Sequence, residues 1–321
     1  MKLVSYRTRE AFAGEPGRTD NLGVVLAGAL VPASALGEHI APSMSDFLRN
    51  WPASLQGIES AVAGIGDRPP RMLSFEQIEM LAPVPRPGKI VCAGVNYHAH
   101  ASEGGRDAPE QPVLFAKLTT SVVGHGAEIR WSPELTQAVD YEAELAVIIG
   151  RTTRRVAEGE ALDYVAGYTC LNDVSARDLQ FADRQFVRGK SLDTFCPMGP
   201  WLVTADEVGD PQNLRVQCIV NGEVLQDAST SEMVAGVAKL VSFCSQAFTL
   251  EPGDVIATGT PSGVGVFRDP PVFLEPGDRV RCEIDGIGSV ENPIVDWSDV
   301  DDDGDDLGLD PDELDDLIGG H

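Results

Sequence analysis

Two glutamates separated by one residue, Glu142 and Glu144, lie within an apolar run and constrain the fold of this chain more than any other feature. Side chains of an extended chain alternate between faces, so both carboxylates are expected on one face of a strand over residues 139–150. The opposite face would pack into a core, since it consists of Tyr141, Ala143, Leu145, Val147 and Ile149. Like charges so close repel each other, and the pattern therefore predicts a buried sheet that holds a divalent cation.

A third carboxylate, Asp173, follows another predicted strand over residues 166–172. Ser175 and Asp178 have the spacing of a capping box, so we expect a helix to start there and Asp173 to lie at a strand-to-helix corner. Three carboxylates would leave positions on an octahedral Mg²⁺ or Mn²⁺ free for water and a chelating substrate. The alternative for the two glutamates alone is an exposed strand face.

Five segments together resemble the fumarylacetoacetate hydrolase family in order and spacing. They are residues 94–103, 140–144, 172–180, 188–200 and 258–265, within a similar region of roughly residues 84 to 295. The resemblance implies a mixed α/β, mainly β fold, with a β roll of the family type and a small α+β N-terminal domain. It also implies a homodimer and a 2-oxo acid as the small-molecule substrate.

The resemblance assigns roles to residues around the three predicted metal ligands. His100 and Glu103 match a dyad that activates water, and Lys190 matches an active-site lysine that holds a substrate oxyanion or carboxylate. Substrate contacts are implied for Arg177, Gln180, Thr260 and Gly259. Judged from the residues alone, the His100–Glu103 pair could instead be a surface contact, and Arg177 could form a structural ion pair. The glycine-rich segment over residues 259–265 could be a tight turn.

The chain divides into three predicted parts. Residues 1–82 form the N-terminal domain, with strands over 2–6 and 22–27 and a helix over 44–63 that Ser45 or Asp46 could cap. A proline-rich connection leads into the catalytic domain, residues 83–296. There we expect a strand over 214–220 with an Asn221-Gly222 hairpin turn, and a helix over 231–246.

The excess of acidic over basic residues limits the kinds of partner that the chain is expected to bind. The formal charge is −26 for 321 residues, and residues 296–321 hold twelve acidic side chains and no Lys or Arg, so the remainder carries −14. Residues 297–321 are accordingly expected to be a disordered tail. A chain this acidic is not expected to bind nucleic acid. With no membrane-length apolar run and no signal-peptide pattern, we expect no membrane contact and a cytoplasmic location, and the six scattered cysteines are expected to be buried free thiols.

The predicted function is a Mg²⁺- or Mn²⁺-dependent hydrolase that cleaves a carbon–carbon bond of a 2,4-dioxo acid such as an acylpyruvate or fumarylpyruvate. A decarboxylase or isomerase of a related 2-oxo acid, including an oxaloacetate decarboxylase or tautomerase, is the alternative, because stabilising an enolate serves these reactions equally. A non-catalytic binding protein with the same fold is a third possibility, which the intact set of carboxylates, dyad and Lys190 disfavours.

Overall fold

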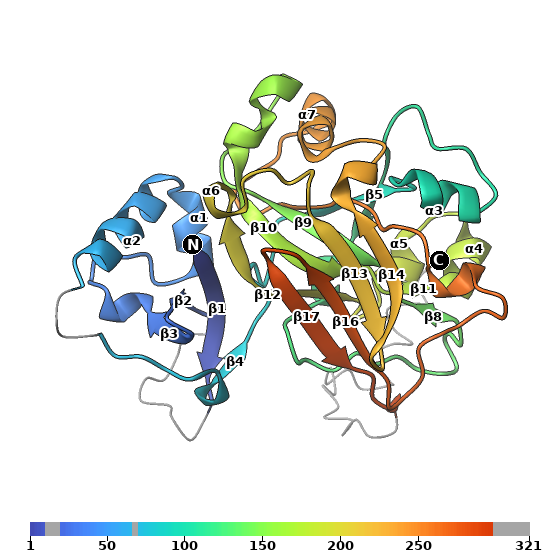
Figure 1. Cartoon of the computed structure of the whole chain (residues 1–321), viewed down its shortest axis with the longest axis horizontal. Helices are drawn as coiled ribbons and strands as arrows, with labels where there is room; N and C mark the ends of the chain where they lie inside the picture. Colours follow the sequence, from blue (N-terminus) through green and yellow to red (C-terminus); the bar gives the residue numbers. More distant parts are fainter. Residues whose placement is uncertain (10–19, 66–69, 298–321) are drawn as a thin grey trace, which may run out of the picture.

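Strands dominate the computed structural model, which describes residues 1–9, 20–65 and 70–297 (Figure 1). The large sheet consists of β1 (Lys2–Thr8), β2 (Asn21–Leu26), β3 (Ala29–Pro32), β4 (Ile78–Met80), β5 (Ile90–Gly94), β6 (Val113–Lys117), β7 (Val122–Val123), β9 (Ala143–Ile149), β10 (Val165–Asn172), β12 (Cys196–Thr204) and β15 (Val255–Ala257). Its order is β3-β2-β1-β12-β10-β9-β15-β5-β6, with β4 paired to β1 and β7 to β12.

A second sheet and a short strand pair complete the β structure. The second sheet has the order β14-β13-β16-β17 and consists of β13 (Arg215–Val220), β14 (Glu223–Ser229), β16 (Arg279–Ile284) and β17 (Gly288–Pro293). The pair is β8 (Val139–Asp140) with β11 (Ser175–Ala176). The α-helices are α1 (Met44–Arg49), α2 (Ala53–Ala63), α3 (His98–Glu103), α4 (Arg177–Asp183), α5 (Val187–Lys190), α6 (Ala205–Val208) and α7 (Val237–Ala247). The predicted mixed, mainly β fold class is confirmed.

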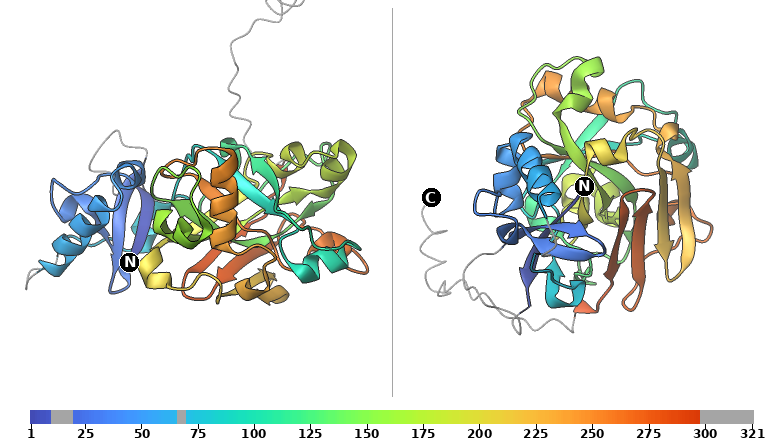
Figure 2. Two further views of the ribbon diagram at one scale, coloured as in Figure 1. Left: turned by 90° about the horizontal axis from the view of Figure 1, so that it is seen from above. Right: turned by 60° about the vertical axis from the view of Figure 1, so that its left-hand side comes forward.

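The large sheet is buried on both faces. Leu145 and Val147 of β9 belong to a core shared with Val216 and Cys282 of the second sheet. The alternate residue Ile148 belongs to a second core, with side chains from α1 and α2. The right-hand view of Figure 2 shows these N-terminal helices and the second sheet on opposite sides of the molecule. The large sheet is thus a middle layer, which explains why β9 is apolar on both faces.

Two predicted helices begin or end at residues other than expected. The helix predicted over 44–63 is interrupted between α1 and α2, where Pro52 follows a cis peptide bond. Proline cannot donate a hydrogen bond to the preceding turn, so it breaks the helix. The cap of α1 is Ser43, whose hydroxyl accepts from the Asp46 N–H, so the predicted cap at Ser45 or Asp46 is wrong. The helix predicted from residue 231 begins instead at Val237, after a separate 3₁₀ turn.

The capping box predicted after Asp173 is also wrong. Ser175 lies in β11, and its hydroxyl donates to the Asp173 carbonyl oxygen instead of capping α4. The Asp178 carboxylate accepts from the Thr136 hydroxyl and from the Leu179 N–H. Asp173 nevertheless lies directly after β10, as predicted. The short strand β11 separates it from the helix α4.

The Asn221-Gly222 hairpin is confirmed, with φ angles of 52° and 86° at the two turn residues. Both angles are positive, which matches the twist of two antiparallel strands.

The N-terminal segment is continuous with the main sheet, since β1 pairs antiparallel with β12 through Lys2 and Leu3. The division into domains near residue 82 stays a prediction, and residues 298–321 of the predicted tail lie outside the described residues. Among the residues described, none of the helices has the length and apolar character needed to cross a membrane. The cytoplasmic location also stays a prediction.

Candidate active site

The three predicted metal ligands meet at one end of the β9–β10 pair. Leu171 of β10 lies opposite Glu144, and the Asp173 N–H donates to the Glu142 carbonyl oxygen at 2.9 Å. This antiparallel register brings residues about thirty positions apart to the same end of the strand pair. One carboxylate oxygen from each of Glu142, Glu144 and Asp173 lies within 4.8 Å of the others, and all three side chains are buried.

The strand predicted over residues 139–150 is interrupted at its acidic end. β8 ends at Asp140 and β9 begins at Ala143, so Glu142 lies in the break and not within the strand. The break lets β8 pair with β11 while β9 pairs with β10. The two glutamates converge although only Glu144 has a strand conformation.

Buried cations neutralise two of the three carboxylates. Asp173 accepts from Lys117 Nζ at 2.5 Å and from Lys190 Nζ at 2.8 Å. Glu142 accepts from Lys190 Nζ at 2.7 Å and forms an ion pair of 2.7 Å with Arg177 Nη2. Each of the two carboxylates therefore contacts two cationic side chains.

Glu144 differs, because its hydrogen bond comes from a backbone group, the N–H of Gly259 at 2.7 Å. Burial raises the pKa of Glu144 well above its ordinary value, and the charges of Asp173 and Glu142 add to the effect. Burial would also raise the pKa of Glu142, but Lys190 and Arg177 outweigh it and lower that pKa to about 2. The fold thus keeps Glu142 charged and disfavours the charge of Glu144.

The charges of the cluster fit a divalent cation. Among the described residues, four buried carboxylates face three buried cations, namely Asp140, Glu142, Glu144 and Asp173 against Lys117, Arg177 and Lys190. With all four carboxylates ionised, the formal net charge of the cluster is one negative, and Glu144 is the carboxylate without a side-chain cation as partner among the described residues. Three converging carboxylate oxygens are donors that Mg²⁺ and Mn²⁺ prefer, and a bound divalent ion would make the cluster net positive toward an anionic substrate.

Gly259 holds Glu144 through the pairing of β15 with β9. Ala257 of β15 lies opposite Ala146, which places Gly259 across from Glu144. Gly259 has a φ of 94°, and a Cβ there would lie 2.8 Å from Asn96 Cβ. The predicted role of Gly259 was a substrate contact, and that role stays a prediction. The contact found for its N–H is Glu144.

The predicted dyad is assembled on α3. His100 Nδ1 lies 2.7 Å from Glu103 Oε1, and Glu103 Oε2 accepts from the Gly263 N–H at 2.8 Å. A carboxylate only accepts hydrogen bonds, so Nδ1 carries the proton of the neutral ring. Nε2 is then left with a free lone pair, and His100 lines the pocket beside the carboxylates.

The other predicted substrate residues are also in or near this pocket. Arg177 donates to Asp140 Oδ2 at 2.8 Å and to Gln180 Oε1 at 3.0 Å, which supports the structural interpretation of its charge. The Thr260 hydroxyl donates to the Ala143 carbonyl oxygen and accepts from Gln226, so its proton is already bound. Whether these residues contact a substrate stays a prediction.

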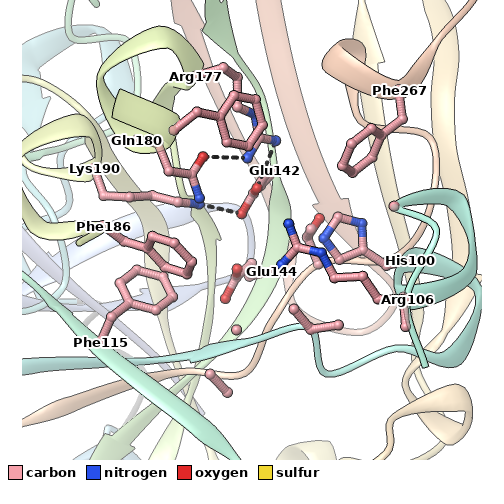
Figure 3. A pocket seen from close by; sticks show the side chains of 17 residues that line it. His100, Arg106, Phe115, Glu142, Glu144, Arg177, Gln180, Phe186, Lys190 and Phe267 are labelled. Atoms are coloured by element: carbon pink, nitrogen blue, oxygen red, sulfur yellow. Dashed lines mark hydrogen bonds and ion pairs between the residues drawn. The ribbon is translucent and has the colours of Figure 1, made fainter. Parts of the chain in front are cut away.

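A single pocket of about 690 Å³, including the space at its mouth, collects most of the predicted site residues (Figure 3). Its lining includes His100, Glu142, Glu144, Arg177, Gln180, Lys190 and Thr260. Four phenylalanines form apolar walls around them, namely Phe115, Phe181, Phe186 and Phe267. Glu103, Asp173 and Gly259 contact these residues from behind the lining. Such walls strengthen electrostatic interactions at the carboxylates by excluding water.

Two buried charges in this cluster were missed by the sequence analysis. Asp140 accepts from Arg177 and from the backbone N–H groups of Gly265 and Val266, so it ties α4 to the 259–268 segment. Asp140 lies two and four residues before Glu142 and Glu144, and this spacing could have indicated that its carboxylate is near theirs. Lys117, which the sequence analysis left without a role, ends β6, and nothing local in the sequence indicates its contact with Asp173.

The chain is similar to known enzymes in both sequence and structure. Residues 89–295 match the family described as Fumarylacetoacetate (FAA) hydrolase C-terminal. An oxaloacetate tautomerase of Xenopus laevis, fahd2, mitochondrial, is 42% identical over 297 residues, which cover 92% of this chain and 90% of the relative. The oxaloacetate tautomerase YisK of Bacillus subtilis (strain 168) is 47% identical over 226 residues, which cover 70% of this chain and 75% of the relative.

Solved structures include a maleylpyruvate hydrolase from Sphingobium sp. SYK-6 in complex with manganese(II) ion and pyruvate. It is 32% identical to this chain with a TM-score of 0.73, and the match covers 92% of this chain and 99% of that one.

Proposed function

Since the chain belongs to the fumarylacetoacetate hydrolase family and is an enzyme of that family, we propose that it is a divalent-metal-dependent oxaloacetate tautomerase. The observation that carries the proposal is the near full-length identity of 42% to a tautomerase. The function predicted from the sequence, hydrolysis of a 2,4-dioxo acid, becomes the second candidate.

Glu142, Glu144 and Asp173 would hold the cation, since their oxygens converge and Glu144 has no cationic side chain as partner in the part of the chain that the structure describes. A bound Mg²⁺ or Mn²⁺ would attract the carboxylate and oxo oxygens of a 2-oxo acid and stabilise negative charge on the oxo oxygen. Lys117, Lys190 and Arg177 hold the neighbouring carboxylates in place through buried ion pairs.

Tautomerisation requires the transfer of one proton between C3 and the C2 oxygen of oxaloacetate. His100 Nε2 accepts a proton from C3, and the electron pair of that C–H bond forms the C2–C3 double bond as charge moves to the oxygen. A proton returned to this oxygen completes the enol, and the reverse steps form the keto acid. Glu103 keeps the imidazole oriented and stabilises its protonated form. Water is neither consumed nor released, so apolar walls do not hinder the reaction.

Hydrolysis of a 2,4-dioxo acid is the second candidate because of the maleylpyruvate hydrolase similarity. In that reaction His100 would take a proton from water instead of from C3, and the water oxygen would attack the distal carbonyl. The same dyad serves both reactions, so the substrate decides between them.

A direct assay separates the two candidates. The decay of the ultraviolet absorbance of enol-oxaloacetate measures tautomerisation, and pyruvate release measures cleavage of maleylpyruvate and a panel of acylpyruvates. We expect kcat/KM for tautomerisation, with Mg²⁺ or Mn²⁺, to exceed that for cleavage by about 100-fold or more. Faster cleavage of any acylpyruvate would establish the hydrolase instead.

A homodimer is proposed from the family resemblance. α5, which supplies Lys190 to the pocket, also borders an apolar groove, whose lining includes Leu118, Leu135, Val187 and Leu192. Leu118 and Leu135 are 54% and 45% exposed, which is unusual for large apolar side chains. Light scattering at micromolar concentration measures the mass directly, and a value near 34.2 kDa would contradict the dimer.

A further inference from the structure

Arg106 differs from the other cations of the pocket because it has no carboxylate partner among the described residues. Arg177 and Lys190 also line the pocket, but both are buried and form ion pairs with Glu142. Their charges are therefore already paired with the metal-site carboxylates. Arg106 is exposed and lines the same pocket, and its guanidinium donates no hydrogen bond within residues 1–9, 20–65 and 70–297.

The backbone places Arg106 directly after the dyad helix. α3 ends at Glu103, and Gly105, with a φ of 66°, turns the chain so that the Arg106 N–H donates to the Ala101 carbonyl oxygen at 3.0 Å. Figure 3 shows the Arg106 side chain reaching toward the carboxylates from the same side as His100, while Lys190 comes from the opposite side. A ligand bound at the carboxylates would thus have Arg106 and Lys190 on two sides.

The available contacts define what this position can recognise. If the carboxylate and oxo oxygens of a 2-oxo acid are held at the metal site, its far end must lie against the remaining lining. That lining is mostly apolar, with Phe115, Phe186 and Phe267 among its walls. A carboxylate without a partner would be unfavourable there, since burying an unpaired charge costs far more than burying a methyl group.

We propose that Arg106 is the specificity-determining residue that binds the distal carboxylate of a 2-oxo diacid. The inference rests on the proposed function, because it assumes that the substrate binds at the carboxylate cluster, and it restricts the preferred substrates to dicarboxylates. A guanidinium binds a carboxylate through two parallel N–H···O hydrogen bonds, which favours a planar carboxylate over a neutral group of similar size. Arg106 takes no part in proton transfer.

A pair of unreactive ligands tests the contact without turnover. L-malate and 2-hydroxybutyrate share the 2-hydroxy acid end, and they differ in a distal carboxylate against a methyl group. With Mn²⁺ present, calorimetry should show that the wild type binds malate about 10- to 100-fold more tightly than 2-hydroxybutyrate. Arg106→Gln should reduce this preference to less than about 3-fold, and Arg106→Lys should restore part of it.

Arg215→Gln is the matched control. It removes one positive charge from β13, where Arg215 forms an exposed ion pair with Asp227 of β14, outside the pocket lining. The control should keep the preference for malate, which separates a local contact from an effect of net charge. A wild type without the preference, or an Arg106→Gln variant that keeps it, would overturn the assignment.

Kinetics then link the contact to the reaction. For oxaloacetate, Arg106→Gln should lower kcat/KM by about 10- to 100-fold, mainly through KM. For the 4-methyl ester of oxaloacetate, which lacks the distal charge, kcat/KM should change by less than about 3-fold. If the wild type had no tautomerase activity but lost its malate preference on Arg106→Gln, the proposed function would fail while the role of Arg106 would stand. Equal losses for the diacid and the ester would contradict that role.

Discussion

Glu144 and Asp173 have similar burial but opposite electrostatic surroundings. Asp173 contacts two lysines, whereas Glu144 contacts a backbone N–H and has two carboxylates nearby. The pKa of Glu144 is raised by burial, so the metal-free fold binds a proton at Glu144 more tightly than the unfolded chain does. Its contribution therefore favours folding at low pH and is lost as the pH rises through the folded-state pKa. A metal ion removes this disadvantage.

Replacing these two carboxylates by amides should have different effects on the metal-free protein. Glu144→Gln should leave the free energy of unfolding unchanged or higher at pH 7, because a neutral group replaces an unfavourable charge. Asp173→Asn should lower it by about 3–5 kcal/mol, since Lys117 is left buried without a counter-charge. Urea unfolding in the presence of EDTA measures both values.

The same variants should lose metal binding together. Mn²⁺ titration by calorimetry should show at least about 100-fold weaker binding for each, because one of three protein ligands is gone. Glu103→Gln is the control, since Glu103 contacts His100 and not the metal-site oxygens. Binding by Glu144→Gln at wild-type affinity would remove Glu144 from the metal site.

His100 should be needed for the reaction and not for the metal. We expect His100→Ala to lower kcat for tautomerisation by about 100-fold or more, with Mn²⁺ affinity unchanged. A His100→Ala variant with normal kcat would leave His100 as a structural residue.

At the scale of elements, strand pairing positions the site. β10 and β15 lie on either side of β9 in the large sheet, and the segments that follow them supply Asp173 and Gly259. The segment after one neighbouring strand thus places Asp173 beside Glu144, and the segment after the other supplies its hydrogen bond. The turn after β15 is held by Asn96, which donates to the Thr258 carbonyl oxygen at 2.7 Å. The metal site therefore depends on how β15 docks against β9.

Gly259→Ala tests this docking. The added Cβ would meet Asn96 Cβ at 2.8 Å and the Ala93 carbonyl oxygen at 2.9 Å, and the positive φ disfavours alanine. We expect Mn²⁺ affinity and activity to fall by about 10-fold or more as the N–H moves away from Glu144.

Gly222→Ala is the matched control, because Gly222 also has a positive φ of 86° but open space around its Cβ position. Its stability should fall by about 1–2 kcal/mol, with metal affinity and activity unchanged. Equal effects of the two substitutions on metal binding would mean that backbone strain, and not the contact with Glu144, explains the loss.

At the scale of the whole molecule, burial on both faces of the large sheet encloses all six cysteines as free thiols, as the sequence analysis predicted. Burial raises the pKa of Cys196 to about 12 and raises that of Cys92 well above its ordinary value. Because the thiolate is the reactive form, these thiols should be unreactive until the fold opens.

We expect the native enzyme to react with less than one equivalent of a thiol reagent such as Ellman's reagent at pH 8, and the protein in denaturant to react with all six. Glu223→Cys, which adds a thiol at an exposed position of β14, is the positive control. Fast labelling of a native cysteine would reveal a local opening of the core around that cysteine.

The sequence by itself indicated that the three carboxylates come together, that His100 and Glu103 pair, and that Asn221-Gly222 forms a turn, because residue spacing and turn chemistry are local properties. The roles of the site residues stay predictions. It did not determine the break before Ala143, since that break depends on β8 pairing with β11. Only the tertiary structure decided which cations balance the carboxylates and which N–H reaches Glu144.

The physical reason is the distance along the chain between the partners. Lys117 and Asp173 are 56 residues apart, and Glu144 and Gly259 are 115 apart. Such contacts follow from the register of strands, which local periodicity does not specify. The same limit applied to Arg106: its charge was visible in the sequence, but its place in the pocket was decided by the packing of α3 and the loop that follows it.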